Sequence, residues 1–545
     1  MEFQTILTEK NRARYKAAGW WEGRTLLDDF DAAVAARPAA TAVVAPDGQR
    51  MSFAGLDEAS RRAAAHLAAL GLEKSDVLSI QLPNWTEFVV LHLAATRLGA
   101  VTNPLLPIYR ENELAYILRF ARTRIAVIPG RYRNFDYPAM YAGMWPDLPD
   151  LKEIFVVGGD APGRMRPVAE LGTPAASPAP ARALDGDDVS APVFTSGTES
   201  KPKGVMHSHN TMMYGTRTMP RLLGLTPDDV VWAPSPLGHG TGFLWGMRQA
   251  LTLGCKLVLQ DIWDPEEALR LIEAERCTFT LSATPFVKML VDSPSAGQRD
   301  TSSFRFFGCA GAPIPRQLGV EAHEKLGCQL IGMWGMTECF VGSASPADDT
   351  EDKLWGTDGR AMPGGELAVF DETRTRMLPP GEIGELATRG PHVALGYFND
   401  PERTAKAFSP DGWLFTNDLA TVDAEGYMRI VGRQKDIINR GGLKISAREV
   451  EEFLLQHPLV KEAAVVAVPD DRLGEKSCAF VVPRGSIAPK LAELVGFLEE
   501  RGIAKYKLPE FLVVIPAFPM TPSGKIQKFV LRDGVAEGTY VAQAA

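Results

Sequence analysis

Residues 76–130 read DVLSIQLPNWTEFVVLHLAATRLGAVTNPLLPIYRENELAYILRFARTRIAVIPG. Short runs rich in apolar and β-branched residues at 76–82 and 100–106 alternate with helical patterns at 86–99 and 112–121. This alternation is typical of βαβ units around a parallel sheet. The segment therefore predicts a doubly wound α/β domain.

A second set of α/β elements follows this segment. Apolar runs predict strands at 230–237, 255–261, 277–283 and 304–312. Residues 264–275 predict a helix, because Asp264 suits an N-cap and Pro265 the first helical position. The Pro-, Ala- and Gly-rich segment from Gly159 to Val189 has no periodic pattern, so we expect a surface linker there.

The pattern changes after Pro363. Residues 364–390 and 420–433 alternate apolar with polar residues around Pro-Gly and Glu-Gly turns, which predicts antiparallel β structure. A smaller α+β unit is expected from about Gln434 onward, with helices at 446–457 and 490–500 and strands at 461–468, 476–482 and 511–516. Ser446 and Glu449 predict a capping box at the first of these helices.

Composition excludes several classes of protein. The chain has 545 residues, of which 45% are hydrophobic and 23% charged, as in ordinary globular proteins rather than disordered or fibrous ones. The length is too great for a small binding module. The net charge of −9 has the wrong sign for a surface that collects nucleic acid or anionic lipid. Any anion must therefore be bound by a local site.

Cysteine usage and hydropathy indicate a cytoplasmic protein. The six cysteines are sparse, and none occurs in the C-x-x-C spacing of a zinc or redox site. The amino terminus lacks the apolar region of a signal peptide, so we expect no secretion. The most apolar stretch, Phe88–Val101, contains His92 and Arg97 and is shorter than the ~20 residues of a membrane span.

The strongest local motif is TSGTESKPKG at 195–204. Its glycines, hydroxyl residues and lysines follow a predicted strand, so backbone N–H groups and hydroxyls can surround a phosphate while a lysine offsets its charge. The motif differs from the Walker A pattern G-x-x-x-x-G-K-[ST]. We therefore interpret it as a phosphate loop outside the P-loop NTPase class.

Further segments follow this loop in order: GCAGAP at 308–313, WGMTE at 334–338, ND at 417–418, GRQKD at 432–436 and PMTPSGK at 519–525. Together with the phosphate loop, they closely resemble the adenylate-forming superfamily. That superfamily includes acyl-CoA synthetases, firefly luciferases and the adenylation domains of peptide synthetases. Medium-chain and cyclohexanecarboxylate CoA ligases are the members most similar in appearance. The resemblance covers the chain beyond about residue 30.

The resemblance implies a fold as well as an activity. The large N-terminal region, residues 1–433, would hold two doubly wound αβ subdomains and a β-barrel-like subdomain. Residues 434–545 would form a small, mobile α+β domain, with Lys435 at the hinge. The implied substrates are ATP, coenzyme A and a carboxylic acid, with Mg²⁺ as the metal.

The resemblance also implies an ATP site. Its residues would be Thr195, Ser196, Gly197, Thr198, Lys203, Gly311, Ala312, Pro313, Trp334, Gly335, Met336, Thr337, Asp418, Arg433 and Lys525. Trp334 would lie along the adenine, and Asp418 would accept hydrogen bonds from the ribose hydroxyls. Arg433 would add a donor at the same sugar. Asn417 replaces the glycine that the family more often has before the aspartate, and asparagine tolerates the positive φ of such a turn.

The residues implied to act in catalysis surround the α-phosphate. Glu338 would bind Mg²⁺, since one carboxylate plus phosphate oxygens is a typical magnesium site. Thr337 would donate its hydroxyl to the α-phosphate, and Lys203 would offset its charge. Lys525 would bridge carboxylate and phosphate during adenylation. His239 either forms a gate beside the acid or is an ordinary structural histidine.

Gly441, Gly442 and Lys444 resemble the pantetheine tunnel of CoA ligases, and no carrier sequence follows Lys525 in this chain. Apolar neighbours of the motifs, including Phe243 and Trp245, suit a medium-chain, alicyclic or aromatic acid, although core packing explains them equally well. Because PMTPSGK also resembles the site that lysine acetyltransferases modify in acyl-CoA ligases, acetylation of Lys525 by such a partner is expected to inhibit the enzyme.

Other functions remain open. An activator of amino acids or carrier proteins would share the adenylation residues, but such domains usually place an aspartate near 237–239 and none occurs there. A luciferase-like monooxygenase also shares these residues. A hydrolase lacks support because no G-x-S-x-G is present. A noncatalytic binding protein would leave the mobile lysine unexplained.

The implied hinge gives the first prediction. Proline fixes φ near about −65°, so Lys435→Pro should trap one conformer of the small domain. We expect this variant to keep much of its adenylation rate and to lose most thioester formation, as measured in separate half-reaction assays. Lys435→Ala is the control and should lose little of either rate. A proline variant that makes thioester at the parent rate would exclude rotation about this residue.

Overall fold

The computed structural model describes residues 3–195, 202–311, 314, 316–520 and 526–544. By internal contacts the chain forms two compact units. The large unit comprises Met1–Glu366 and Arg389–Leu414, and the C-terminal unit comprises Leu367–Thr388 and Phe415–Ala545. The predicted domain boundary between residues 433 and 434 falls inside the second of these units and remains a prediction about motion.

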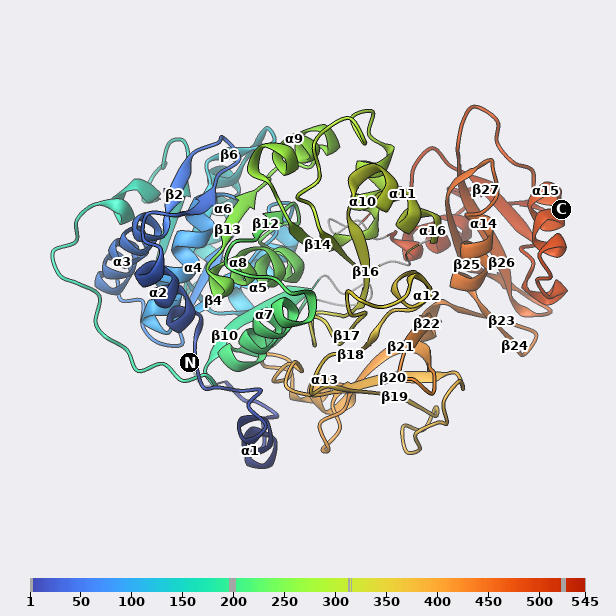
Figure 1. Ribbon diagram of the computed structural model, residues 1–545, viewed down its shortest axis with the longest axis horizontal. Coiled ribbons are helices and arrows are strands. Elements are labelled where there is room, and N and C mark those ends of the chain that lie inside the picture. The colour runs from blue at the N-terminus through green and yellow to red at the C-terminus, as the bar shows by residue number, and fades with distance from the viewer. Residues whose placement is uncertain (1–2, 196–201, 312–313, 315, 521–525, 545) are drawn as a thin grey trace. The chain divides into compact units, whose positions relative to one another are not determined.

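Residues 76–130 contribute to a parallel sheet in the large unit, as predicted (Figure 1). The strand order is β4-β3-β5-β8-β9, and each pairing is parallel. The strands are β3 (Val77–Ile80), β4 (Val101–Pro104), β5 (Thr123–Pro129), β8 (Glu153–Val157) and β9 (Arg166–Pro167), and a small hairpin joins β6 (Arg131–Tyr132) to β7 (Phe135–Asp136). The helices are α4 (Thr86–Leu98), α5 (Glu111–Phe120), α6 (Tyr137–Met144), η1 (Trp145–Asp147) and η2 (Val168–Gly172).

The second sheet of the large unit has the order β18-β17-β16-β15-β14-β12-β13-β1-β2. Its strands are β1 (Thr41–Val44), β2 (Arg50–Ser52), β12 (Val230–Ala233), β13 (Lys256–Leu259), β14 (Phe279–Ala283), β15 (Phe306–Ala310), β16 (Gln329–Trp334), β17 (Ser343–Ala344) and β18 (Arg360–Ala361). The predicted strands form its parallel centre. Sequence analysis missed β1, which pairs in parallel with β13, and β2, which forms the adjacent edge.

The other helices of the large unit are α1 (Glu9–Ala17), α2 (Leu26–Ala36), α3 (Phe53–Ala69), α7 (His209–Leu223), the π-helix η3 (Thr241–Arg248), α8 (Gln249–Leu253), α9 (Pro265–Glu275), α10 (Thr284–Asp292), α11 (Arg316–Leu326), α12 (Glu351–Gly356) and α13 (Pro401–Ala407). A separate antiparallel hairpin pairs β10 (Val189–Thr195) with β11 (Lys203–Ser208). The two ends of the phosphate loop are therefore held side by side by a hairpin.

The C-terminal unit contains two sheets. An antiparallel sheet has the open order β19-β20-β21-β22, formed by β19 (Glu366–Phe370), β20 (Gly384–Arg389), β21 (Leu414–Val422) and β22 (Met428–Arg433). The other has the order β24-β23-β26-β27-β28 with β25 paired to β26, formed by β23 (Ile437–Arg440), β24 (Leu443–Ser446), β25 (Val460–Asp470), β26 (Gly474–Pro483), β27 (Phe511–Val514) and β28 (Gln543–Ala544). The helices are η4 (Gln434–Asp436), α14 (Ala447–Leu454), α15 (Leu491–Glu500), η5 (Lys505–Lys507) and α16 (Lys528–Ala536). The predicted mixed α/β class is confirmed.

Helix caps follow the sequence closely, with one correction. Asp264 accepts from Glu267 N at the start of α9, and Pro265 is the first helical residue, as predicted. Ser446 likewise accepts from Glu449 N at α14. The capping box predicted there is incomplete, because the Glu449 carboxylate accepts instead from Lys507 at 2.7 Å. A nearby cation offers that carboxylate a stronger, charge-assisted hydrogen bond.

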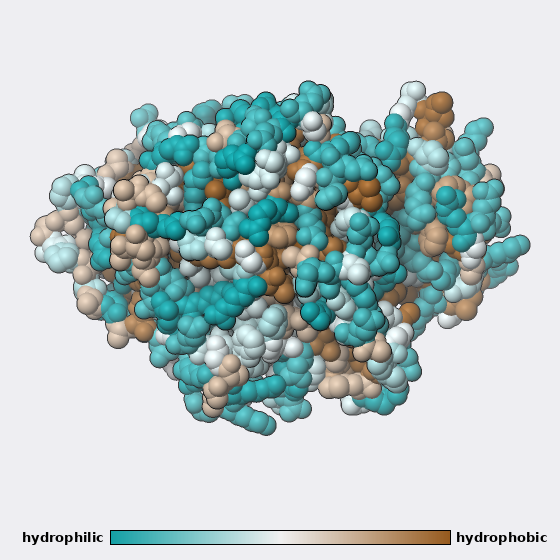
Figure 2. All heavy atoms as spheres, viewed as in Figure 1, coloured by the Kyte–Doolittle hydropathy of each residue, from teal (hydrophilic) through white to brown (hydrophobic). Residues whose placement is uncertain are grey.

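Apolar side chains make up most of the buried core. All six cysteines are buried free thiols, and burial raises the pKa of Cys255 to about 12. The face shown in Figure 2 is covered mainly by hydrophilic residues. Within the described residues, no helix is both long and apolar enough to span a membrane.

Close packing of α11 on α12 supports the strand that leads into the WGMTE motif. A Cβ added at Gly319 of α11 would lie 2.4 Å from the Trp355 ring of α12. The carbonyls of Leu354 and Thr357 likewise lie within 2.9 Å of where a Cβ would stand on Gly332 of β16. These contacts fix the strand end that carries Trp334.

We therefore expect Gly319→Ala to lower the free energy of unfolding by about 1–3 kcal/mol, because the added methyl group overpacks this contact. Gly143→Ala is the matched control, since Gly143 is also helical and nothing lies within 4 Å of its added Cβ. The control should be neutral or stabilising by up to about 1 kcal/mol. Denaturant unfolding monitored by circular dichroism compares them. Equal midpoints would contradict the packing argument.

Candidate active site

The phosphate loop joins two paired strand ends. Thr195 ends β10 and pairs with Lys203, which begins β11. The Thr195 Oγ1 atom is buried and has no hydrogen-bond partner among the described residues. A buried hydroxyl at this point can donate to a bound phosphate. The predicted ligands Ser196, Gly197 and Thr198 lie outside the described residues.

The WGMTE motif forms a tight turn after β16. Trp334 ends the strand, and a Cβ on Gly335 would lie 1.6 Å from the Phe340 carbonyl oxygen. Phe340 itself has a φ of 52°, in the left-handed region that bulky residues seldom adopt. The turn therefore requires glycine at 335 and holds Thr337 and Glu338 in a defined place.

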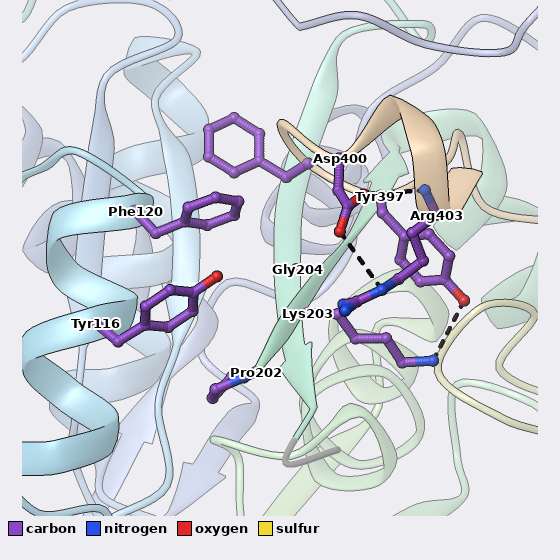
Figure 3. Close-up of a pocket in the computed structure, with 9 residues that line it drawn as sticks. Tyr116, Phe120, Pro202, Lys203, Gly204, Tyr397, Asp400 and Arg403 are labelled. Carbon is purple, nitrogen blue, oxygen red and sulfur yellow. Dashed lines mark hydrogen bonds and ion pairs between the residues drawn. The ribbon is translucent and has the colours of Figure 1, made fainter. Parts of the chain in front are cut away.

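Lys203, Glu338 and Tyr397 meet in one cluster. Glu338 is 1% exposed. Its Oε1 atom accepts from Lys203 Nζ and, at 2.7 Å, from the Tyr397 hydroxyl. Lys203 Nζ also lies 3.2 Å from that hydroxyl, as the dashed line in Figure 3 shows. The buried carboxylate is thus neutralised by the lysine of the phosphate loop.

Backbone pairing with β11 brings Tyr397 into this cluster. Leu395 N donates to Met206 O at 2.8 Å, Met206 N donates to Gly396 O at 3.0 Å, and Tyr397 forms an antiparallel bridge with Val205. Burial, followed by the charge of Glu338, raises the pKa of Tyr397. The phenol therefore stays protonated and donates to the carboxylate.

His207 supports the same turn from β11. Its Nε2 atom lies 2.8 Å from the Thr337 carbonyl and its Nδ1 atom 3.1 Å from Thr211 Oγ1. Its ring lies 4.1 Å from that of Phe340. Burial lowers the pKa of His207 to about 4, so the ring is neutral at pH 7 and can donate to the carbonyl from Nε2. His207 thereby orients the peptide that carries Thr337.

A cavity of about 200 Å³ adjoins Lys203 (Figure 3). Tyr116 and Phe120 of α5 line it, with ring centroids 5.3 Å apart. Arg403 and Asp400 also line it and lie 3.4 Å from each other. Both cations of the lining, Lys203 and Arg403, are thus paired with carboxylates.

The predicted acid and adenine residues lie on neighbouring segments. His239 accepts at Nδ1 from Thr241 N, at the start of η3, and is partly exposed. A Cβ added at the adjoining Gly240 would lie 3.3 Å from the Phe340 ring, so this segment packs against the WGMTE turn. Gly311 has a φ of 84° at the end of β15. Ala312 and Pro313 lie outside the described residues.

The predicted ribose residues are paired within the C-terminal unit. Arg433 Nε donates to Asp418 Oδ1 at 3.1 Å, and the two residues face each other across β21 and β22. Asn417 lies inside β21 rather than in a turn and has a φ of 59°, so this position needs a residue tolerant of the left-handed region, as expected. The Arg433 guanidinium thus orients the Asp418 carboxylate, which would accept hydrogen bonds from the ribose hydroxyls.

The other predicted residues of this unit lie in and around β23 and β24. Gly441 and Gly442 have φ values of 59° and 87° in the turn between β23 and β24. Lys444 follows in β24 and pairs with Glu372. Lys435 lies in η4. Lys525 lies outside the described residues, so its role remains a prediction.

The residues present fit a magnesium site in which the nucleotide supplies most ligands. No cluster of three or more His, Cys, Asp or Glu side chains suited to a metal occurs in the part of the chain that the structure describes. Glu338 offers a single buried carboxylate beside the phosphate loop. Mg²⁺ is commonly held by one or two carboxylates together with substrate phosphates and water.

Sequence analysis missed Tyr397 and His207. Tyr397 lies in ALGYFND, which has no local pattern that indicates catalysis. It reaches Glu338 only because residues 395–398 pair with β11, about 190 positions earlier in the chain. His207 appears in sequence as one more residue of a buried strand. Long-range pairing, which a single sequence does not reveal, determines both positions.

Comparison with known proteins agrees with these observations. A family model described as AMP-binding enzyme matches residues 30–398, and one described as AMP-binding enzyme C-terminal domain matches residues 449–525. The chain is 40% identical to a medium-chain fatty-acid–CoA ligase of Escherichia coli K12, covering 98% of this chain and 94% of the relative. It is 35% identical to a 2,3-dihydroxybenzoate-AMP ligase of Bacillus subtilis 168, covering 96% of each.

A solved structure gives the same result at the level of the fold. The anthranilate CoA ligase AuaEII, in complex with anthranoyl-AMP, superimposes with a TM-score of 0.86 at 26% identity. The match covers 95% of this chain and 98% of that one.

The cluster around Glu338 gives a prediction. Tyr397→Phe keeps the packed ring but removes a hydrogen bond to a buried carboxylate, which is worth about 1.5–3 kcal/mol. We expect adenylate formation to slow by about 10- to 100-fold, measured by pyrophosphate release. Tyr116→Phe, which removes a hydroxyl from the same cavity wall, is the control and should stay within about twofold of the parent. Equal rates for the two variants would show that the Tyr397 hydroxyl does not contribute.

Proposed function

Because the chain belongs to the family of AMP-binding enzymes and is an adenylate-forming acid ligase, we propose that it makes acyl-CoA thioesters. In the first step a hydrophobic carboxylic acid attacks the α-phosphate of ATP, giving an acyl-adenylate and pyrophosphate. In the second step the thiol of CoA attacks the acyl carbon, giving the thioester and AMP.

The cluster of Lys203, Glu338 and Tyr397 is the observation that carries the adenylation step. Joining a carboxylate to a phosphate brings two anions to about 4 Å, where they repel by about 4 kcal/mol at an effective dielectric constant near 20. Lys203 stands where the phosphate loop ends and supplies a positive charge. The adjoining Thr337, whose peptide His207 orients, supplies a hydroxyl donor for the α-phosphate.

Glu338 would hold Mg²⁺ together with phosphate oxygens. The bound ion would offset the negative charge of the polyphosphate as pyrophosphate leaves. The Glu338 carboxylate accepts hydrogen bonds from Lys203 and Tyr397, which hold it in a defined orientation. Lys203 can turn from this carboxylate to a phosphate, because its flexible side chain is a quarter exposed, at 26%.

The thioester step and the nature of the acid rest on fewer observations. The similarity to a medium-chain fatty-acid–CoA ligase extends over nearly the whole chain and supports CoA as the acceptor. Phe243, Leu244 and Trp245 of η3 are buried and lie a few residues after His239. Because these residues pack in the core of the large unit, the proposal of a compact hydrophobic acid, of medium-chain, alicyclic or aromatic type, follows from the sequence pattern around the motifs. Gly441, Gly442 and Lys444 are our candidates for contacts to pantetheine.

A second candidate differs only in the acceptor. The 35% identity to a 2,3-dihydroxybenzoate-AMP ligase favours, as the alternative, an enzyme that passes its adenylate to a carrier protein or another acceptor. A cytoplasmic location and acetylation of Lys525 remain predictions.

Pyrophosphate exchange with ATP across a panel of acids tests the adenylation step, and thioester formation with CoA tests the acceptor. We expect exchange with compact hydrophobic acids and acyl-CoA from the same acids. Lys525→Ala should slow adenylation by about 100-fold or more, yet convert supplied acyl-adenylate and CoA at the parent rate. Exchange without any thioester would favour the alternative acceptor, and equal loss of both half-reactions would contradict the role of Lys525.

A further inference from the structure

An ion pair that the site does not use joins two helices of the C-terminal unit. Lys528 Nζ lies 2.7 Å from Glu451 Oε1. Glu451 is on α14, Lys528 is the first residue of α16, and both helices pack on β25 (Figure 1). The side chain of Lys528 is 23% exposed and that of Glu451 is 15% exposed, so solvent screens their attraction only weakly.

Glu451 is tied to more than one element. Val465 N in β25 donates to its Oε1 atom at 2.6 Å. Burial raises the pKa of Glu451, and Lys528 is the main group that opposes this effect. The negative charge of Asp436, in η4, also raises the pKa of Glu451. The charge of Lys528 therefore partly offsets the effect of burial on this enclosed carboxylate.

The pair stands beside the attachment of the segment that carries Lys525. Residues 521–525 lie outside the described residues, but the chain on either side is fixed. Met520 forms an antiparallel bridge with Ile526, and Gln527 N donates to Pro519 O at 2.8 Å. Lys528 follows at once and is held by Glu451. The chain that follows Lys525 is thus anchored within three residues of it.

We propose that Glu451 and Lys528 are positioning residues for Lys525, because their ion pair fixes the start of α16 and with it the attachment of the Lys525 segment. The inference rests on the proposed function, in which Lys525 acts in adenylation. Neither residue touches the reacting atoms. A displacement of about 1 Å at a reacting group slows an enzyme by up to about 100-fold. Even a small shift at the start of α16 should therefore slow adenylation.

A purely structural role predicts a different outcome. The same unit holds the turn at Gly441 and Gly442, our candidate for the CoA contacts. Loosening of the whole unit would therefore slow both half-reactions together. A shift confined to the start of α16 would slow adenylation alone, since Lys525 has no part in the thioester step.

The test removes each charge in turn. Lys528→Met and Glu451→Gln both break the pair, and the glutamine keeps an acceptor for Val465 N. We expect adenylation, measured in a single turnover, to fall by about 10- to 100-fold while supplied acyl-adenylate and CoA still give thioester at the parent rate. Lys528→Arg restores a cation and should return adenylation to within about threefold of the parent.

Lys507→Met is the matched control. It breaks the ion pair, also 2.7 Å long, between Lys507 and Glu449. Glu449 lies on α14, as Glu451 does, but Lys507 lies in η5 rather than in α16. This variant should not separate the two half-reactions. Three results would overturn the proposal. They are parent rates of adenylation in Lys528→Met and Glu451→Gln, equal loss of both half-reactions in these variants, and failure of both variants to fold. Failure of the proposed function is distinct, since the parent enzyme would then show no exchange with any acid.

Discussion

A carboxylate removed from water must be paired, and this requirement organises the centre of the large unit. Glu338 is almost fully buried, and an ion of its size loses several kcal/mol of solvation when it enters a protein interior. Lys203 and the Tyr397 hydroxyl compensate for that loss. The hairpin of β10 and β11 supplies the first partner, and residues 395–398 supply the second by pairing with β11. Three distant parts of the chain thus meet at one charge.

Local chemistry explains which features were visible in the sequence. The N-cap at Asp264, the proline after it and the left-handed residue Asn417 depend on near neighbours, and all appear where they were expected. The parallel strands of residues 76–130 were also predictable, since their apolar runs are short and bounded. The motif residues Lys203 and Glu338 were found through their resemblance to a family.

Features that depend on distant contacts were not predictable from one sequence. Tyr397 and His207 contact the site only through backbone pairing across long stretches of chain. The strands β1 and β2 join the second sheet from the amino-terminal region, although about 210 residues separate β1 from its neighbour β13. At α14, Ser446 acts as the local rule requires, but Lys507 takes the carboxylate of Glu449. A local rule fails when tertiary structure offers a stronger partner.

The burial of every cysteine has a practical consequence for measurement. The thiolate is the reactive form, and a thiol whose pKa is about 12, as for Cys255 and Cys328, is ionised in only about one molecule in 10⁴ to 10⁵ near neutral pH. None of the six side chains is exposed to reagent. A chromogenic disulfide such as Ellman's reagent should therefore react slowly with the folded protein and quickly with free coenzyme A. In assays of the proposed thioester step, the CoA that remains can then be measured by colour in samples withdrawn from the reaction, and a rise in protein-derived colour would report unfolding.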